Sequence, residues 1–263
     1  MTPEMLAALE ALSAEGQALV AGGGLVFARI GPVFALLPVF GERVVPARIR
    51  LVAALAMTAV VAPAVAGRIV LPASSPLGWA LFLGAETLVG LALAMALRIM
   101  VMVLQMAGTK AAQATSLSQA FGGAGVDPQP AISQVLVMGG LAAIVLTGFP
   151  ERLAVLLVLS YDFFPAGHWP DPGSLAQWGT GRVARAFALA FSLAAPFVIG
   201  SALYNLALGA INRAMPQLMV AFVGAPALTL GGLVLFALAA PLMLAIWLGA
   251  FHGVLADPMV LPP

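Results

Sequence analysis

Long apolar stretches separated by short polar connections dominate the pattern of hydrophobic and polar positions along this chain. Most of the stretches come close to the roughly 20 residues that an α-helix needs to cross the hydrocarbon of a bilayer. They cover residues 17–41, 51–67, 77–108, 131–149, 184–212 and 217–250. The connections cover residues 41–50, 68–76, 109–130, 150–182 and 213–216. The pattern predicts an all-α integral membrane protein of about six hydrophobic helices.

The overall composition excludes a soluble protein. Of the 263 residues, 62% are hydrophobic and 8% are charged, and the mean hydropathy is +1.09. Soluble domains carry about 25% charged residues, which this chain lacks. The formal net charge of +1 offers no basic face for nucleic acid, and the absence of cysteine excludes disulfides and thiolate metal sites.

The amino-terminal stretch is acidic, whereas the first connection is basic. The acidic residues before the first basic residue, Arg29, are Glu4, Glu10 and Glu15. A cleaved signal peptide starts with a basic region, so we expect this segment to be retained as a short amphipathic helix. The first connection holds Arg43, Arg48 and Arg50. The positive-inside bias then predicts that this connection is cytoplasmic and that the amino terminus is periplasmic.

Prolines interrupt most of the apolar stretches. They stand at Pro32, Pro38, Pro63, Pro196, Pro226 and Pro241. Each removes a backbone donor and kinks or breaks a helix, and a backbone group freed at membrane depth must be satisfied by protein or by a water-filled cavity. The prolines together predict kinked helices that either line a conduit or are covered by neighbouring chains.

Two ionisable residues, Glu86 and Arg98, lie in the third apolar stretch. A charge at the centre of a membrane helix costs about 2.5–3.5 kcal/mol. These two residues are separated by about 18 Å along a helix, so they cannot pair with each other. Each therefore needs a partner from another stretch or another subunit, or else snorkels to the membrane interface.

Three methionines near Arg98 have the spacing of one helical face. They are Met95, Met102 and Met106. Methionine is flexible and adapts to irregular gaps between helices. The group is therefore either a deformable seal or ordinary filling of the core.

The sequence offers no arrangement of catalytic residues. Its two histidines, His168 and His252, stand far apart and have no neighbours at the spacing of metal ligands. The chain has neither a phosphate-binding G-x-x-x-x-G-K-[ST] loop nor a G-x-S-x-G nucleophile turn. We therefore expect no enzyme activity, no cofactor and no metal. Glu86 is the only acidic residue within the apolar stretches, which argues against an ion-coupled carrier.

Residues 109–130 form an unusually polar interval between two apolar stretches. The front part is compatible with a polar helix, because Gln113, Ser116 and Gln119 do not favour lipid. The Gly- and Pro-rich part that follows predicts a turn. The interval is therefore either a solvent loop or a flexible plug, tipped by Phe121, that folds into a pore.

Three motifs stand in order along the chain. The first combines Phe27-Ala28-Arg29-Ile30, Leu37-Pro38-Val39-Phe40-Gly41 and Val45-Pro46-Ala47-Arg48-Ile49-Arg50. The second runs from Ser118 to Asp127-Pro128, and the third is Asn212-Arg213-Ala214-Met215-Pro216-Gln217. Together they resemble the flagellar biosynthetic protein FliR family, and the likeness extends from about residue 20 to 250.

The resemblance implies a subunit of the type III export gate in the bacterial inner membrane, at the flagellar basal body. One such subunit assembles with several FliP and FliQ subunits into a cone-shaped helical complex, next to FlhB and FlhA. The complex passes unfolded export substrates across the membrane. The implied fold is a set of bent helical hairpins, with a FliP-like part over about residues 1–182 and a FliQ-like hairpin over residues 183–263.

The resemblance also suggests roles for particular residues. The family's central loop acts as a plug in the closed channel, which here corresponds to Phe121, Gly122, Gly123, Gly125, Asp127 and Pro128. Further positions from the matching motifs are Pro38, Pro46, Pro216 and Gln217. The charged candidates for pairing between subunits are Arg29, Arg48, Arg50, Glu86, Arg98 and Arg213. The chain departs from the family at Val126, at Met219 and in lacking a lysine after Pro226, which concerns contacts with neighbouring subunits.

Two other functions remain as alternatives. The homologous subunit of a virulence injectisome would share the fold, but the stretch at residues 45–48 favours the flagellar system. A small secondary transporter that acts alone would instead fold without partners and carry its substrate into liposomes.

Overall fold

The computed structural model describes residues 3–37, 45–72, 75–115, 131–215 and 220–258, and these ranges are almost entirely helical. In chain order the helices are α1 (Pro3–Leu36), α2 (Ala47–Val65), η1 (Ala66–Arg68, a 3-10 turn), α3 (Pro76–Thr115), α4 (Ala131–Leu146), α5 (Phe149–Phe163), α6 (Pro172–Ala214) and α7 (Val220–Ala256). The described ranges contain no strand. The predicted all-α class is confirmed.

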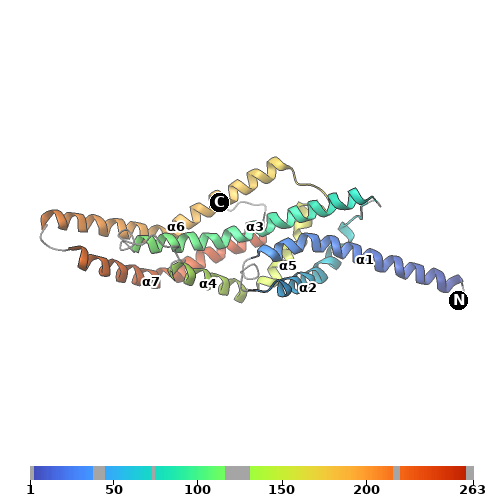
Figure 1. Ribbon diagram of the computed structural model, residues 1–263, viewed down its shortest axis with the longest axis horizontal. Coiled ribbons are helices and arrows are strands. Elements are labelled where there is room, and N and C mark those ends of the chain that lie inside the picture. Colours follow the sequence, from blue (N-terminus) through green and yellow to red (C-terminus); the bar gives the residue numbers. More distant parts are fainter. Residues whose placement is uncertain (1–2, 38–44, 73–74, 116–130, 216–219, 259–263) are drawn as a thin grey trace.

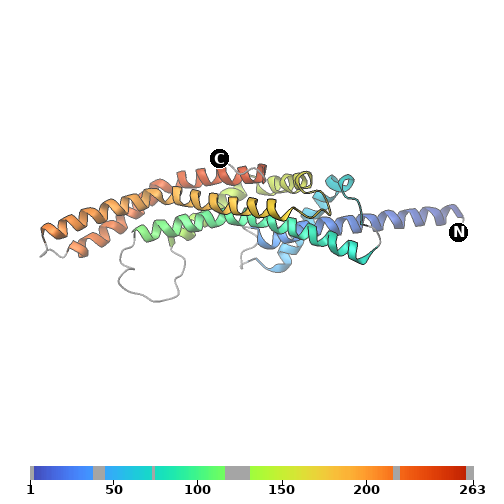
Figure 2. The same ribbon diagram turned by 90° about the horizontal axis from the view of Figure 1, so that it is seen from above.

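The helices form an elongated bundle built around α3 (Figure 1). This helix of 40 residues packs against α1, α4, α6 and α7. Helices α6 and α7 run side by side in opposite directions in both views (Figure 2). The far end of this pair and the amino end of α1 lie at opposite ends of the long axis. The helices are therefore staggered along the molecule and do not share one layer.

The core lies where α3 meets its neighbours. Leu97 and Leu104 are completely buried there. Gly108 lies so close to α4 that a Cβ at this position would come within 2.5 Å of the Ser133 Cα. The Ser133 hydroxyl donates to the Gln105 carbonyl across the same contact, at 3.1 Å. Small residues and polar bonds of this kind bring membrane helices into close contact, because lipid gives no hydrophobic drive for their association.

Five helices are long and apolar enough to cross a membrane, and α4 with α5 make a sixth if this bent pair counts as one span. The predicted number of about six is confirmed. The 76° bend between α4 and α5 lies next to Gly148, whose φ of 76° favours glycine. Helices α1, α2 and α6 continue through Pro32, Pro63 and Pro196. The sharp bend therefore lies at Gly148, between α4 and α5, whereas the helices that contain these three prolines are not broken by them.

The connection expected at residues 150–182 is wrong in large part, because α5 and the first turns of α6 occupy it. Leu153, Leu156 and Leu157 are buried on one face of α5 at helical spacing. This apolar run is short and follows Glu151 and Arg152, so its polar neighbours concealed it. The domain boundary predicted between residues 182 and 183 falls inside α6, where no element ends.

Candidate functional site

A buried ion pair joins α1 to α3. The Arg29 Nε donates to Glu86 Oε2 at 2.7 Å, and Nη2 donates to Oε1 at 3.0 Å, so two parallel bonds connect the groups. The two side chains are only 0% and 2% exposed. The partner that Glu86 needs therefore comes from another stretch of the same chain. This pair requires no charge from another subunit.

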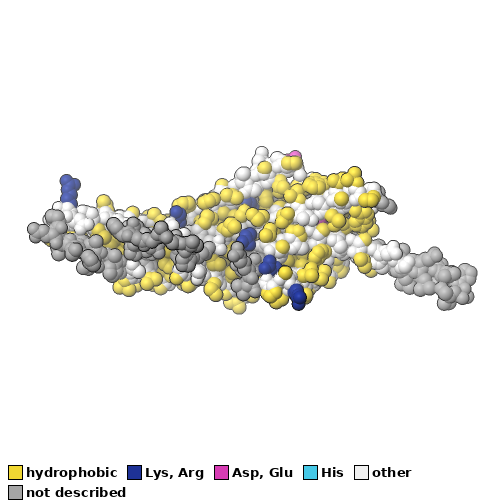
Figure 3. Space-filling view, in the orientation of Figure 1, with side chains coloured by type: hydrophobic (Ala, Val, Ile, Leu, Met, Phe, Trp, Pro, Cys, Tyr) yellow, Lys and Arg dark blue, Asp and Glu magenta, His cyan; other side chains and the backbone are white. Residues whose placement is uncertain are grey.

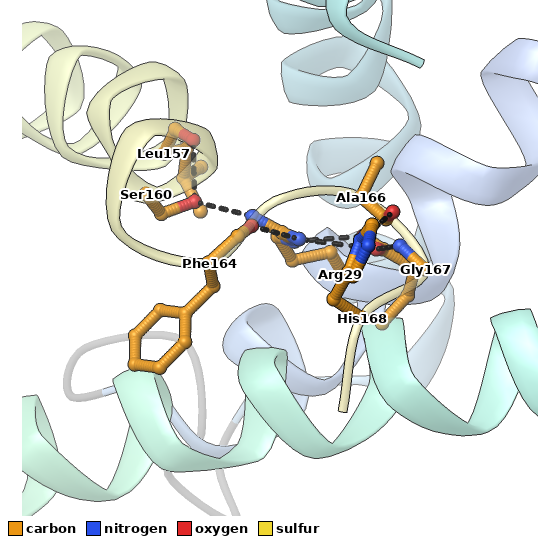
Figure 4. A network of polar contacts seen from close by, with 8 residues as sticks. Arg29, Leu157, Ser160, Phe164, Ala166, Gly167 and His168 are labelled. Carbon is orange, nitrogen blue, oxygen red and sulfur yellow. Dashed lines mark hydrogen bonds and ion pairs between the residues drawn. The ribbon is translucent and has the colours of Figure 1, made fainter. Parts of the chain in front are cut away.

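The other donors of Arg29 reach α5 and the loop that follows it (Figure 4). Its Nη1 donates to the Ser160 hydroxyl at 3.1 Å, and its Nη2 donates to the Phe164 carbonyl at 2.9 Å. The guanidinium also lies over the ring of Tyr161, with 3.6 Å between Cζ and the ring centroid, which is a cation–π contact. Three helices therefore meet at one arginine.

Glu86 holds the same loop from the other side. Its Oε1 accepts the backbone N–H of Gly167 at 2.9 Å. Gly167 has a φ of 72°, and a Cβ at this position would lie 2.5 Å from the ring of Phe82. Glycine is therefore required here by the backbone conformation and by the lack of space beside α3.

This network is suited to holding helices together. Moving charges into an apolar interior costs several kcal/mol, and only a well-bonded pair recovers that cost. Ser160, Phe164 and Gly167 supply the additional bonds. The described part of the chain holds no group of three or more His, Cys, Asp or Glu side chains that could bind a metal ion.

A second buried cluster connects α7 to α3 and α4. The completely buried Trp247 donates its indole N–H to the Met100 carbonyl at 2.6 Å. Gly140 of α4 makes room for this contact, because a Cβ there would lie 2.3 Å from Leu104 Cδ1 and 3.1 Å from the Trp247 ring. The ring of Phe251 lies 5.2 Å from that of Trp247, centroid to centroid. This cluster fixes the carboxyl-terminal half of α7 against the middle of α3.

The other charged residues predicted to pair between subunits lie nearer the surface. Arg48 and Arg213 are exposed. Arg98 is half-buried, and its Nη1 reaches the Leu36 carbonyl at 3.5 Å. Their pairing with other chains stays a prediction.

The turn before α2 contains two of the predicted positions. Pro46 precedes the helix, and its carbonyl accepts the N–H groups of Ile49 and Arg50 at 3.0 and 3.3 Å. The Arg50 Nη2 donates to the Val45 carbonyl at 2.8 Å. In this structure both residues contribute to the start of α2.

The three methionines differ in their exposure. Met95 and Met102 are 41% and 37% exposed, whereas Met106 is partly buried against the core. Two of them therefore lie on the outside of the bundle, where lipid or another chain can contact them. A sealing role stays a prediction.

Several predicted residues lie outside the part of the chain that the structure describes. They are the plug residues Phe121, Gly122, Gly123, Gly125, Asp127 and Pro128, together with Pro38, Pro216 and Gln217. The helical front of the polar interval is confirmed as far as Thr115, where α3 ends.

Sequence reasoning missed the α5 side of the buried network. Ser160, Phe164 and Gly167 all fall in the stretch interpreted as a connection. One signal could have found the first of them: Ser160 follows Leu153, Leu156 and Leu157 at the spacing of one helical face. A hydroxyl on an apolar face needs a hydrogen-bonding partner, which points to a polar group on a neighbouring helix.

Apolar side chains cover much of the surface shown in Figure 3. On α6 and α7 the exposed ones include Phe187, Phe191, Leu203, Leu206, Leu238 and Leu242, each between 49% and 75% exposed.

A groove of about 920 Å³ also lies between α1 and α2, lined by Gly22, Phe27, Leu55 and other residues, most of them apolar. Surfaces of this extent are covered by lipid or by other proteins.

The sequence of this chain is similar to those of known export proteins. The sequence profile of the family described as "Bacterial export proteins, family 1" matches residues 20–254. The flagellar biosynthetic protein FliR of Caulobacter vibrioides is 32% identical to this chain over 237 residues, which cover 88% of this chain and 93% of the relative.

Proposed function

Because the chain belongs to the bacterial export proteins of family 1, we propose that it is a subunit of the flagellar type III protein export gate. It forms, with FliP and FliQ, the channel through which unfolded flagellar proteins cross the inner membrane. One copy of this chain enters each complex, and FlhB and FlhA lie next to it. The amino terminus faces the periplasm.

The observation that carries this proposal is an apolar surface that one bilayer cannot cover. Helices α6 and α7 have 43 and 37 residues. At 1.5 Å per residue they are about 65 and 55 Å long, whereas the hydrocarbon of a bilayer is about 30 Å thick. On α6 the exposed apolar side chains extend from Val183 to Ile211, which is about 42 Å along the helix and longer than the hydrocarbon. Other protein chains must therefore cover part of this surface.

The groove between α1 and α2 supports the same conclusion. Side chains added at Gly22, Gly23 or Gly24 would meet nothing within 4 Å, so this side of α1 is open. Small residues on an open apolar groove allow a further helix to approach closely. A helix of a neighbouring subunit fits these requirements.

The gate subunit does no chemistry of its own, and other components supply the energy for export. The plug role of Phe121, Gly122, Gly123, Gly125, Asp127 and Pro128 is part of the proposal, and it rests on the resemblance of their motif to the family's central loop. In this mechanism an entering substrate displaces the plug and opens the path.

The alternatives receive less support. The relative from Caulobacter is named as a flagellar biosynthetic protein, which favours the flagellar system over a virulence injectisome. A transporter that acts alone would not leave α6 apolar over about 42 Å, because that length exceeds the hydrocarbon of a bilayer.

Native mass spectrometry of tagged protein, gently extracted from its host membranes, tests the proposal. We expect a particle with one copy of this chain and several FliP and FliQ subunits. The same extraction from cells without the FliP gene provides the control, in which this particle should be missing. A stable monomer or homodimer from wild-type membranes would contradict the proposed function.

A further inference from the structure

The carboxyl end of α3 rests in a notch on α7. Thr115, the last residue of α3, is 8% exposed. A Cβ on Gly232 of α7 would lie 2.1 Å from Thr115 Cγ2 and 2.6 Å from Thr115 Cβ. The Thr115 hydroxyl donates to the Ala112 carbonyl of its own helix at 3.0 Å, so the methyl group is the part that meets α7. The notch exists because residue 232 has no side chain, and we call it the Thr115 seat.

The glycine next in sequence has the opposite surroundings. Gly231 is exposed, whereas Gly232 is buried. A Cβ on Gly231 would meet nothing within 4 Å, although both glycines lie inside α7. Glycine allows the backbone of one helix to come close to another. Of these two neighbours, Gly232 is the one that serves this purpose.

Packing beside the Thr115 seat is loose. A pocket of about 180 Å³ adjoins Thr115, and its other lining residues include Phe197 and Tyr204 of α6 and Gly231 of α7. A side chain that lines an open space has no packing partners on that side. The contact with Gly232 therefore contributes strongly to fixing the position of Thr115.

The seat lies at one end of the polar interval, and a similar contact lies just beyond the other end. The described fold resumes at Ala131, and Ser133 is completely buried beside Gly108 of α3. Gly108 and Thr115 are about 10 Å apart along α3. Holding both ends of a connecting segment limits the positions that its middle can reach. Two glycine contacts therefore fix where the interval leaves the helices and where it returns.

We propose that Gly232 is a positioning residue for the plug. It seats Thr115, and it thereby places the start of the segment that closes the channel. This inference rests on the proposed function, because the plug role of Phe121 and its neighbours comes from there. The front of the interval belongs to α3, but its position is set by α7.

The seat also connects the plug to a surface that other subunits can reach. Leu230, Leu233 and Val234 stand next to Gly232 on α7 and are 66%, 50% and 53% exposed. In the proposed gate another subunit covers this apolar surface. Such a subunit holds α7 in place, and through Gly232 it also holds the start of the plug.

Potassium efflux from liposomes that contain the assembled complex tests the proposal. Gly232→Ala pushes Thr115 out of its seat and should raise the efflux per particle roughly tenfold, because overpacking at a close contact shifts a closed–open equilibrium by about this factor. Gly231→Ala is the matched control, since it adds the same methyl group where a Cβ meets nothing. Its efflux should equal that of wild type. Equal efflux for the two variants would overturn the proposal.

A reciprocal exchange separates positioning from general stability. Thr115→Gly empties the seat without any collision, so it should also raise the efflux, even if Gly232→Ala assembles poorly. The double variant Gly232→Ala, Thr115→Gly supplies the small side chain from α7 instead of α3, and its efflux should return close to the wild-type value. A general loss of stability would lower the yield of particles in native mass spectrometry and would not be reversed by the exchange. Efflux that stays high in the double variant would contradict the role of the seat.

A shortened interval distinguishes this inference from the proposed function. Removal of residues 120–126 takes away most of the plug and should open the channel. If this complex leaks but Gly232→Ala and Thr115→Gly do not, only the present inference fails. If the shortened chain assembles and does not leak, the plug role in the proposed function fails, and the inference fails with it.

Discussion

A Cβ on Gly90 would lie 2.1 Å from the carbonyl oxygen of Arg29. Gly90 follows Glu86 by one turn of α3, so the backbone of α1 is pressed against α3 directly beside the buried ion pair. The absence of a side chain at one position therefore allows the two charges to meet at 2.7 Å.

Gly90→Ala should destabilise the chain by about 1–3 kcal/mol, because the atom it meets is backbone and cannot turn away. The midpoint of thermal unfolding in detergent measures the effect. Gly249→Ala is the matched control, since Gly249 is also helical and a Cβ there meets nothing within 4 Å. Equal midpoints for the two variants would mean that α1 and α3 do not pack closely at Gly90.

Glu86→Gln should reduce the free energy of unfolding by about 3–5 kcal/mol, because it leaves the charge of Arg29 buried without a counter-charge. The double variant Arg29→Met, Glu86→Leu should recover only part of the loss, since it removes both charges but leaves the Phe164 carbonyl and the Gly167 N–H without these partners. Denaturant titration followed by helical circular dichroism measures both.

The control for this pair is Asp162→Asn, which removes the partner of Arg68 at the surface. These side chains are 44% and 50% exposed, so we expect a change within about 1 kcal/mol. A loss for Glu86→Gln no larger than for Asp162→Asn would contradict the role assigned to the buried network.

The residues of this network show how far the sequence alone can lead. Glu86 stands as a lone acid in an apolar stretch, so its need for a partner could be predicted. That Arg29 is the partner could not, because the two residues are 57 positions apart and only the packing of α1 on α3 brings them together. Arg98 carries the same signal, and among the described residues the partner found for it is the Leu36 carbonyl.

Helix α5 shows why part of the fold escaped prediction. Its 15 residues are too few to cross a membrane, and Glu151 and Arg152 lower the hydropathy of its first turn. The long helices α3, α6 and α7 were predictable because composition alone identifies an apolar stretch of that length. The direction in which an exposed side chain such as Met102 points depends on packing between helices, which hydropathy does not encode.

Gly167→Ala should destabilise the chain more than Gly148→Ala. Both glycines have positive φ, 72° and 76°, so both variants strain the backbone. Only at Gly167 would the new Cβ also collide with the ring of Phe82, at 2.5 Å. We expect a loss of roughly 1–3 kcal/mol beyond that of Gly148→Ala, measured as the difference in free energy of unfolding. A larger loss at Gly148 would mean that the loop after α5 is not packed against α3.

Leu206→Ala should impair assembly while leaving the fold of the chain intact. Leu206 is 73% exposed on α6, so the chain itself loses little when the side chain is shortened. If another subunit covers it, the complex loses about 1.5–3 kcal/mol, or roughly tenfold to a hundredfold in affinity.

Leu193→Ala on the same helix is the matched contrast: Leu193 is only 4% exposed, so its loss should lower the stability of the chain by about 2–5 kcal/mol. Native mass spectrometry measures assembly, and thermal unfolding measures the fold. Unchanged assembly for Leu206→Ala would indicate that lipid, and not a neighbouring chain, covers this face of α6.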